Sequence, residues 1–178
     1  MNVTVFGGAQ PKEGTAAYEE ARELGALLAQ NGHTVLTGGY MGTMEAVSRG
    51  ASENGGHVIG VTCEDIEAWR GTKANQWVKE ERKFKTLVDR MMELIQVNDG
   101  AIALSGGVGT LAEITLMWNL MIVESLSPRP LILVGSGWQS TFDQFFKEFE
   151  SYMPVRQQEL IYFAGDVKTA VKILENGE

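Results

Sequence analysis

The sequence predicts an α/β fold: a single doubly wound, Rossmann-like domain in which a mostly parallel sheet is flanked by helices. Three observations lead to this prediction. Short runs of β-branched and other apolar residues alternate with segments of helical periodicity. Glycine-rich turns follow several predicted strands, and no linker or internal repeat divides the 178 residues. We therefore expect residues 1–178 to form one domain with right-handed crossovers.

The first part of the chain predicts three strands and two helices. The run NVTVF at positions 2–6 has the pattern of a strand and is followed by glycines. Residues 15–31 carry alanine and leucine at helical spacing, and Asn31-Gly32 is a good signal for the end of a helix. Similar patterns predict strands at 33–37 and 57–62 and a helix at 43–54.

The second part continues the alternation after a less regular segment. Residues 63–76 are polar and lack a period, so we expect an irregular flap over a site there. The remaining expected elements are a helix that starts near Trp77 or Phe84 and ends at 98, strands at 101–104, 130–134 and 160–163, and helices at 110–124, 141–152 and 167–176. This order, with short connections, is typical of a parallel sheet that is covered on both faces.

Composition and charge exclude several classes of protein. The chain has 15 Lys and Arg against 23 Asp and Glu, and the net charge of −8 argues against a nucleic-acid-binding surface. No apolar run approaches the ~18 residues that a membrane span needs. The start of the chain lacks the features of a signal peptide. The single cysteine, Cys63, cannot form an internal disulfide and fits a reducing compartment. We expect a cytoplasmic protein with neither nucleic acid nor membrane as a partner.

Three glycine-rich turns should meet at one edge of the sheet. They follow the predicted strands that end at Phe6, Thr37 and Leu104. Ligands of doubly wound sheets bind at the carboxyl ends of the strands, near the topological switch point. We therefore expect a ligand site built around these turns, whose glycines are Gly8, Gly38, Gly39, Gly42, Gly106, Gly107 and Gly109.

The strongest local signal is the stretch LSGGVGTLAEI at positions 104–114. It joins a strand to an apolar helix, and a helix N-terminus presents free N–H groups and a partial positive charge to an anion. Glycines let a phosphate approach those groups. The stretch is neither a Walker loop nor a Gly-x-Gly-x-x-Gly dinucleotide fingerprint. The sequence thus favours a phosphate site at Gly106, Gly107, Gly109 and Thr110 and gives no direct support to ATP or NAD.

Glu113 has two interpretations. Thr110-x-x-Glu113 has the spacing of a capping box, in which the Thr110 side chain accepts from the N–H at 113 and the Glu113 side chain accepts from the N–H at 110. Alternatively, Glu113 is a catalytic carboxylate beside the phosphate. The two interpretations are compatible if Glu113 caps the helix in the empty protein and faces a ligand when one is bound.

The motif resembles a known family. The sequence SGGVGTLAEI is similar to the Pro-Gly-Gly-x-Gly-Thr-x-x-Glu signature of the Lonely Guy family, phosphoribohydrolases of cytokinin nucleotides that are also labelled "possible lysine decarboxylase". The stretch VFGGAQ at 5–10 stands in the place of the family's first strand and turn. The stretch LTGGYMGTMEAVSRGA at 36–51, which includes Gly42 and Met44, resembles the second turn and its helix. The resemblance covers about residues 2–125.

The family also carries an arginine on the helix before the signature. By the resemblance this arginine precedes the first signature position by fifteen residues, and counting back from Ser105 gives Arg90. We therefore prefer Arg90 to Arg82, which we expect two helical turns upstream and in solvent. The alternative interpretation of Arg90 is a structural ion pair with Glu93 or Glu113.

Several positions depart from the family pattern. Ser105 replaces the signature proline, and Leu116 replaces the carboxylate that follows the signature glutamate in many plant members. Around Arg90, the residues Leu87, Val88 and Met91 replace the family's Met, His and Lys. These departures leave nucleotide cleavage as the expectation and weaken the case for cytokinin specificity.

The resemblance implies an enzyme that cleaves the N-glycosidic bond of a nucleoside 5′-monophosphate, with Glu113 and Arg90 as catalytic residues and no metal or cofactor. The alternative is a non-catalytic carrier of a phosphorylated ligand, such as a nucleotide or molybdenum cofactor. The sequence argues against lysine decarboxylation, because the glycine-rich turns hold no lysine for pyridoxal phosphate. Side chains that could shape a base pocket are Met41, Met44 and Trp69, or those of a second subunit.

The predicted helix at 110–124 is apolar nearly all round. One face of a sheet does not need so much apolar surface from one helix. We therefore expect a homodimer with this helix at the subunit interface, as is common in the family. His33 and His57 begin strands and are interpreted as structural.

Overall fold

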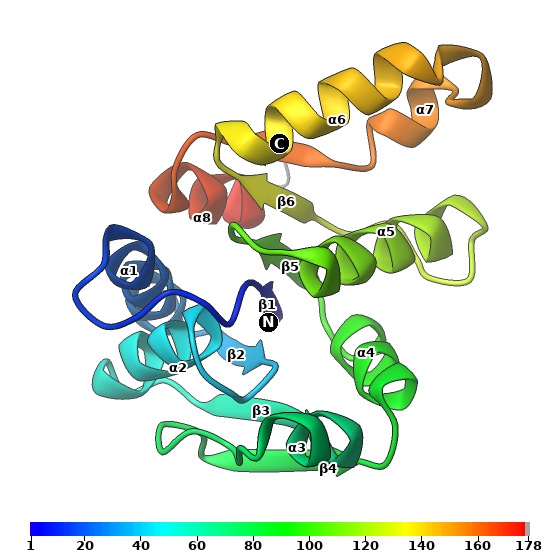
Figure 1. The fold of residues 1–178 in the computed structure, drawn as a ribbon. Helices are drawn as coiled ribbons and strands as arrows, with labels where there is room; N and C mark the ends of the chain where they lie inside the picture. Colours follow the sequence, from blue (N-terminus) through cyan, green and yellow to red (C-terminus); the bar gives the residue numbers. More distant parts are fainter. Residues whose placement is uncertain (177–178) are drawn as a thin grey trace.

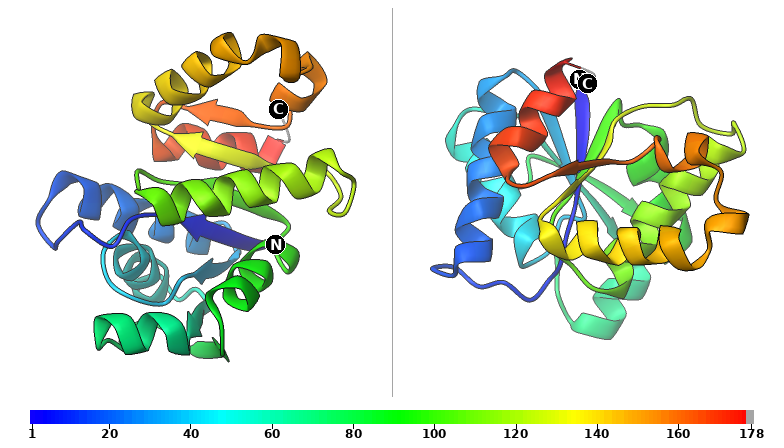
Figure 2. Two further views of the ribbon diagram at one scale, coloured as in Figure 1. Left: turned by 45° about the vertical axis from the view of Figure 1, so that its right-hand side comes forward. Right: turned by 90° about the horizontal axis from the view of Figure 1, so that it is seen from above.

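A computed structural model, which describes residues 1–176, has the expected architecture. Seven parallel strands form one sheet in the order β4-β3-β2-β1-β5-β6-β7, with helices on both faces (Figures 1 and 2). The strands are β1 (Asn2–Phe6), β2 (Thr34–Thr37), β3 (Val58–Cys63), β4 (Glu80–Phe84), β5 (Gly100–Ala103), β6 (Leu131–Val134) and β7 (Tyr162–Ala164). The doubly wound α/β prediction is confirmed.

Eight α-helices and one short 3₁₀-helix connect and cover the described strands. They are α1 (Ala16–Gln30), α2 (Thr43–Glu53), α3 (Glu64–Arg70), α4 (Leu87–Gln96), α5 (Val108–Ile122), α6 (Ser136–Glu148), the 3₁₀-helix Glu150–Tyr152, α7 (Val155–Gln158) and α8 (Val167–Asn176). In the described chain no helix is long and apolar enough to cross a membrane.

The two faces of the sheet pack against different sets of helices. Alternate residues of each central strand point to opposite faces, so Val5 belongs to one cluster and Phe6 to the other. Helices α1, α2 and α8 cover the Val5 face with a mainly aliphatic cluster. Helices α4, α5 and α6 cover the Phe6 face, and this cluster contains the buried Trp118, Trp138 and Phe142. Burial of both faces explains the continuous apolar runs of the strands.

The switch point of the sheet lies between β1 and β5. From β1 the chain builds outward through β2, β3 and β4, and it then returns to the other side of β1 to form β5. The turns after these two central strands therefore diverge to opposite sides of the sheet and leave room between them, as Figure 1 shows for the loops that lead to α1 and α5.

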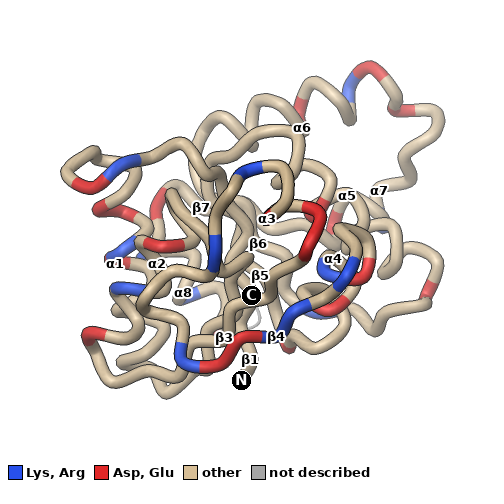
Figure 3. The backbone as a smooth tube through the Cα atoms, turned by 60° about the horizontal axis from the view of Figure 1, so that its bottom comes forward, with Lys and Arg blue, Asp and Glu red and all other residues tan. Residues whose placement is uncertain are grey.

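The expectations for residues 63–98 are wrong in two respects. The segment expected to be irregular contains α3, and the region where a helix was expected to begin contains the strand β4. β4 has the sequence EERKF and pairs with β3 alone, so its charged side chains reach solvent at the edge of the sheet. Figure 3 shows acidic and basic positions interspersed along it. Helix α4 starts only at Leu87, after Thr86, whose side chain accepts from the N–H of Asp89 at 3.1 Å.

The expected helix at 141–152 is shifted. Helix α6 starts at Ser136 after Gly135, which has a φ of 100°, and it ends at Glu148. Its first turn contains glycine and serine and therefore shows no apolar period, although Trp138 packs inward and donates its ring N–H to the carbonyl of Leu104 at 3.0 Å. The short helix α7 was not expected.

Candidate functional site

The three glycine-rich turns do meet at the carboxyl edge of the sheet. The N–H of Gly8 donates to the carbonyl of Ser105 at 3.2 Å, which joins the turn after β1 to the turn after β5. The carbonyl of Gly8 accepts from both the N–H and the hydroxyl of Thr43, at 2.9 and 3.0 Å. This second contact joins the turn after β1 to the start of α2. One continuous backbone surface therefore spans the switch point.

The N-terminus of α5 is open to solvent. The helix begins at Val108, and Gly107 occupies the cap position with no side-chain cap. The first backbone bond of the helix runs from the N–H of Leu111 to the carbonyl of Gly107 at 3.0 Å, so the preceding N–H groups are left for another acceptor. A Cβ at Gly107 or Gly109 would have nothing within 4 Å. The geometry suits a bound anion.

The capping-box interpretation of Glu113 is wrong. Because α5 starts two residues before Thr110, this threonine lies inside the helix and is buried. The Thr110 hydroxyl packs against Gly106, where a Cβ would lie only 2.1 Å from it. The carboxylate of Glu113 is paired with Arg90 instead.

Glu113 and Arg90 form a buried acid–base pair beneath the glycine turns. The Nη1 atom of Arg90 donates to Oε1 of Glu113 at 3.4 Å, and both side chains are buried. The Nε atom of Arg90 donates to the carbonyl of Val61 at 2.8 Å, and the guanidinium carbon lies 5.8 Å from the centroid of the Tyr40 ring. Arg90 is thus held by α5, β3 and the loop after β2 as the partner of Glu113, and its ligand-facing role stays a prediction.

Arg82 occupies a different environment. It lies on the edge strand β4, not on a helix as expected, and it pairs with Glu80 at 2.7 Å and with Glu93 at 2.8 Å. Glu93 is therefore the partner of Arg82 and not of Arg90. Of the two arginines, Arg90 is the one that the fold brings to the glycine turns.

Burial raises the pKa of the Glu113 carboxyl to about 7, although the charge and the hydrogen bond of Arg90 act to lower it. Near pH 7 this carboxyl therefore exchanges readily between its protonated and ionised forms. A carboxyl with such a pKa is suited to accept or release a proton during a reaction. A strongly shifted carboxyl at the ligand edge of the sheet is a candidate catalytic group.

Gly38, Gly39 and Gly42 are needed for the close packing of the loop after β2, and Gly38 packs directly against Arg90. A Cβ at Gly38 would lie 1.9 Å from Nη2 of Arg90 and 2.6 Å from the sulfur of the buried Met44. Gly39 and Gly42 have φ values of 77° and 76°, in the region that favours glycine. A Cβ at Gly42 would lie 2.5 Å from the carbonyl oxygen of Gly8. Direct contact between these residues and a ligand stays a prediction.

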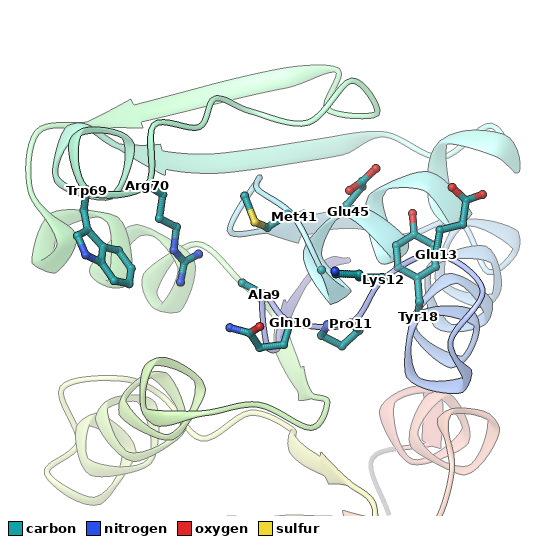
Figure 4. A pocket seen from close by; sticks show the side chains of 11 residues that line it. Ala9, Gln10, Pro11, Lys12, Glu13, Tyr18, Met41, Glu45, Trp69 and Arg70 are labelled. Atoms are coloured by element: carbon teal, nitrogen blue, oxygen red, sulfur yellow. The ribbon is translucent and has the colours of Figure 1, made fainter.

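A pocket of about 460 Å³ continues from the glycine turns (Figure 4). Its walls come from the turn after β1, the loop after β2 and helix α3. The lining includes Gln10, Lys12, Met41, Glu45, Trp69 and Arg70. Met41 and Trp69 were candidates from the sequence. Lys12 and Arg70 were missed, because nothing in their local pattern separates a pocket charge from a solvated one.

The two histidines and the cysteine lie away from the glycine turns or have structural contacts. His33 is buried and pairs with Glu175 of α8, whereas His57 pairs with Glu80 at the surface at 3.1 Å. Cys63 is fully buried and unpaired. Within residues 1–176, no group of three or more His, Cys, Asp or Glu residues is placed to hold a metal ion.

Fold and site together define a Rossmann-like protein with an open glycine cradle above a buried glutamate–arginine pair. The chain belongs to the SLOG cluster4 family, whose model matches residues 1–148, and its curated relatives confirm the expected kinship with the Lonely Guy family.

Two plant relatives illustrate this kinship. The cytokinin riboside 5′-monophosphate phosphoribohydrolase LOG3 of Arabidopsis thaliana is 29% identical over 177 residues, which span 97% of this chain and 81% of the relative. The probable cytokinin riboside 5′-monophosphate phosphoribohydrolase LOGL6 of Oryza sativa subsp. japonica is 34% identical over 177 residues, which span 97% and 70%.

Among solved structures, the molybdenum cofactor binding protein of Rippkaea orientalis has the same fold. It superposes with a TM-score of 0.76 at 23% identity, over 98% of this chain and 94% of that one.

Proposed function

We propose that the chain is a nucleoside 5′-monophosphate phosphoribohydrolase, which hydrolyses the N-glycosidic bond to give a free base and ribose 5-phosphate. The observation that carries this proposal is the buried Glu113–Arg90 pair directly beneath an uncapped, glycine-lined helix N-terminus. The activity in the names of the relatives supports it.

The phosphate binds at the N-terminus of α5. The backbone N–H groups of Gly107, Gly109 and Thr110 donate to its oxygens, and the partial positive charge of the helix favours its negative charge. Gly106 allows Thr110 to pack beneath the turn. The turn at Gly8 and the loop at 38–42 border the same space.

Glu113 and Arg90 act on the ribose. Breaking the glycosidic bond develops positive charge on the sugar ring, which a nearby carboxylate stabilises. Ionised Glu113 also orients the attacking water and takes its proton while the oxygen bonds to the anomeric carbon. The bond to the base breaks at the same centre, and the base leaves with the bonding electrons. The base gains one proton from solvent, and Glu113 releases the proton of the attacking water to solvent, which restores the carboxylate. Arg90 orients Glu113 and binds phosphate or ribose oxygens through its planar fork.

Release of free base from a panel of nucleoside monophosphates, followed by chromatography, tests the proposal. The panel includes AMP and an isopentenyl-adenine nucleotide, because the names of the relatives point to cytokinin nucleotides. We expect release by the wild type, a loss of most turnover in Glu113→Gln with binding preserved, and normal turnover in the surface control Glu20→Gln. Unchanged turnover in Glu113→Gln would remove this residue from the mechanism.

A carrier of a phosphorylated ligand is the competing function. The altered surroundings of Arg90 favour it: Leu87 and Val88 are exposed apolar residues where the family resemblance leads us to expect Met and His. The carrier reading predicts that nucleotides raise the melting temperature but remain intact for hours. Lysine decarboxylation is not supported by the relatives, and an unchanged absorbance spectrum on addition of pyridoxal phosphate would exclude it.

We further propose a homodimer formed through α4 and α5, which lie side by side (Figures 1 and 2). Val88 is 66% exposed, and Leu87, Val108 and Leu111 are also exposed on these helices. A second copy would cover this apolar surface. Sedimentation should give twice the chain mass, and Val88→Asp should lower the apparent mass.

We also propose a cytoplasmic location. Its support is the single cysteine, Cys63, which is buried and unpaired in a chain without a disulfide. Cell fractionation of the tagged protein tests the proposal, and recovery in a membrane or secreted fraction would contradict it.

A further inference from the structure

The pocket beside the glycine turns carries a side chain that the proposed mechanism does not use. Trp69 is 76% exposed at the end of α3, although tryptophan is a residue that usually gains from burial. Arg70 lies next to it, with its guanidinium carbon 4.9 Å from the centroid of the indole ring. In Figure 4 both side chains project from α3 toward the turn that carries Ala9 and Gln10.

Helix α3 is held firmly over this pocket at both ends. Before the helix, the Tyr40 hydroxyl accepts from the N–H of Cys63 at 2.8 Å and donates to the carbonyl of Cys63 at 3.0 Å. After the helix, the Asn75 side chain donates to the carbonyls of Gly39 and Tyr40 at 3.0 and 2.8 Å. Cys63 and Asn75 therefore both bind the loop after β2, and the same loop packs against Arg90. The segments that flank α3 are thus tied to the loop that contacts Arg90.

The other side chains of α3 are engaged elsewhere. Glu67 pairs with Lys83 of β4, and Asp65 accepts from the N–H of Leu87 at 2.9 Å. These contacts face away from the pocket, toward the edge strand and α4. Trp69 and Arg70 are left facing the pocket, whose lining reaches the glycine turns at Ala9 and Gly42, with one face of the indole covered by the guanidinium.

We infer that Trp69 is the stacking platform for the base of the nucleotide and that Arg70 steadies it. This inference rests on the proposed function, because it takes the phosphate at α5 as the anchor of the ligand. A pocket of about 460 Å³ has the size of a small-molecule site. A flat base stacked on tryptophan, beside an arginine, is a common mode of nucleotide recognition. Trp69 is thus a specificity-determining residue, and it takes no part in the bond cleavage.

Two ligands separate the base site from the phosphate site. AMP carries both groups, whereas ribose 5-phosphate carries only the phosphate and the sugar. We expect AMP to quench the fluorescence of the wild type and ribose 5-phosphate to leave it unchanged, while both ligands bind in calorimetry. The quenching does not require turnover.

Three variants then assign the signal. Trp69→Phe keeps a flat ring, so AMP affinity should be nearly unchanged while the quenching disappears. Trp69→Ala should weaken AMP binding on the order of tenfold and leave ribose 5-phosphate binding unchanged. Trp77→Phe is the matched control, because Trp77 lies between α3 and β4 and packs under Arg49, outside the pocket lining. It should retain the quenching.

The results distinguish the two proposals. Quenching by AMP without release of base from any nucleotide of the panel would overturn the enzyme and leave the platform in place. Release of base with the same AMP affinity in Trp69→Ala would overturn the platform and leave the enzyme in place. An equal loss of affinity for AMP and ribose 5-phosphate in Trp69→Ala would also overturn the platform, because the effect would then concern the phosphate site.

Discussion

The raised pKa of Glu113 makes a quantitative prediction about stability. The pKa of this buried carboxyl moves from 4.5 to about 7, so the folded state binds the proton more tightly than the unfolded chain does. The stability that the protonated Glu113 carboxyl contributes is therefore fully present below the unfolded pKa of 4.5 and is lost as the pH rises through about 7. One pKa unit corresponds to about 1.4 kcal/mol, and the wild type should lose about 2 to 3 kcal/mol between about pH 5 and about pH 8.5. Glu113→Gln has no carboxyl to ionise and should not show this loss.

Urea unfolding followed by far-UV circular dichroism measures the difference. The free energy of unfolding of Glu113→Gln, minus that of the wild type, should rise across this pH range by the stated amount. Glu20→Gln, on the exposed face of α1, controls for the loss of one carboxylate from the net charge. Parallel pH profiles of Glu113→Gln and the wild type would refute the reasoning, since they would mean that the ionised carboxylate is already well solvated or fully compensated by Arg90.

Three further predictions follow from the geometry. Gly38→Ala should destabilise the fold by about 1–3 kcal/mol and lower turnover, because the new Cβ would collide with Arg90. Gly107→Ala, where a Cβ has open space, should leave thermal unfolding unchanged and raise the KM for the nucleotide. Equal melting temperatures for the two variants would contradict this prediction. Arg82→Ala should keep turnover within about twofold of the wild type, since only two partly exposed ion pairs, to Glu80 and Glu93, are lost. A loss as large as that of Arg90→Ala would reverse the assignment of the functional arginine. Dialysis against EDTA should leave base release unchanged, and recovery of lost activity by a divalent ion would show that the mechanism is incomplete.

The order of elements was predictable because most strands of this sheet are buried on both faces. Such strands read as apolar runs, and the helices between them carry a regular apolar period. β4 was not predicted, because it lies at the edge of the sheet and is not buried on both faces. Its four consecutive charged residues are those of a solvated edge strand, and no local pattern separates EERKF in a strand from the same residues in a helix.

The residues of the site were predictable, but the contacts between their side chains were not. The glycines after β1, β2 and β5 were placed at one edge by topology alone, and Arg90 was found by counting along the family motif. The start of α5 was misplaced by two residues, because the threonine and glutamate have the spacing of a capping box. What the glutamate does instead depends on Arg90, which approaches from another helix, and such a long-range contact leaves no trace in the local sequence.

The division of the interior into two clusters has a practical consequence for spectroscopy. Both buried tryptophans, Trp118 and Trp138, lie on the side of the sheet covered by α4, α5 and α6, whereas Trp69 lies in α3 and Trp77 in the connection from α3 to β4. The buried cluster formed with α1, α2 and α8 contains no tryptophan among its described members. The emission of Trp118 and Trp138 therefore reports on the layer of α4, α5 and α6, and a disagreement between their emission and circular dichroism during unfolding would show that the two layers unfold separately.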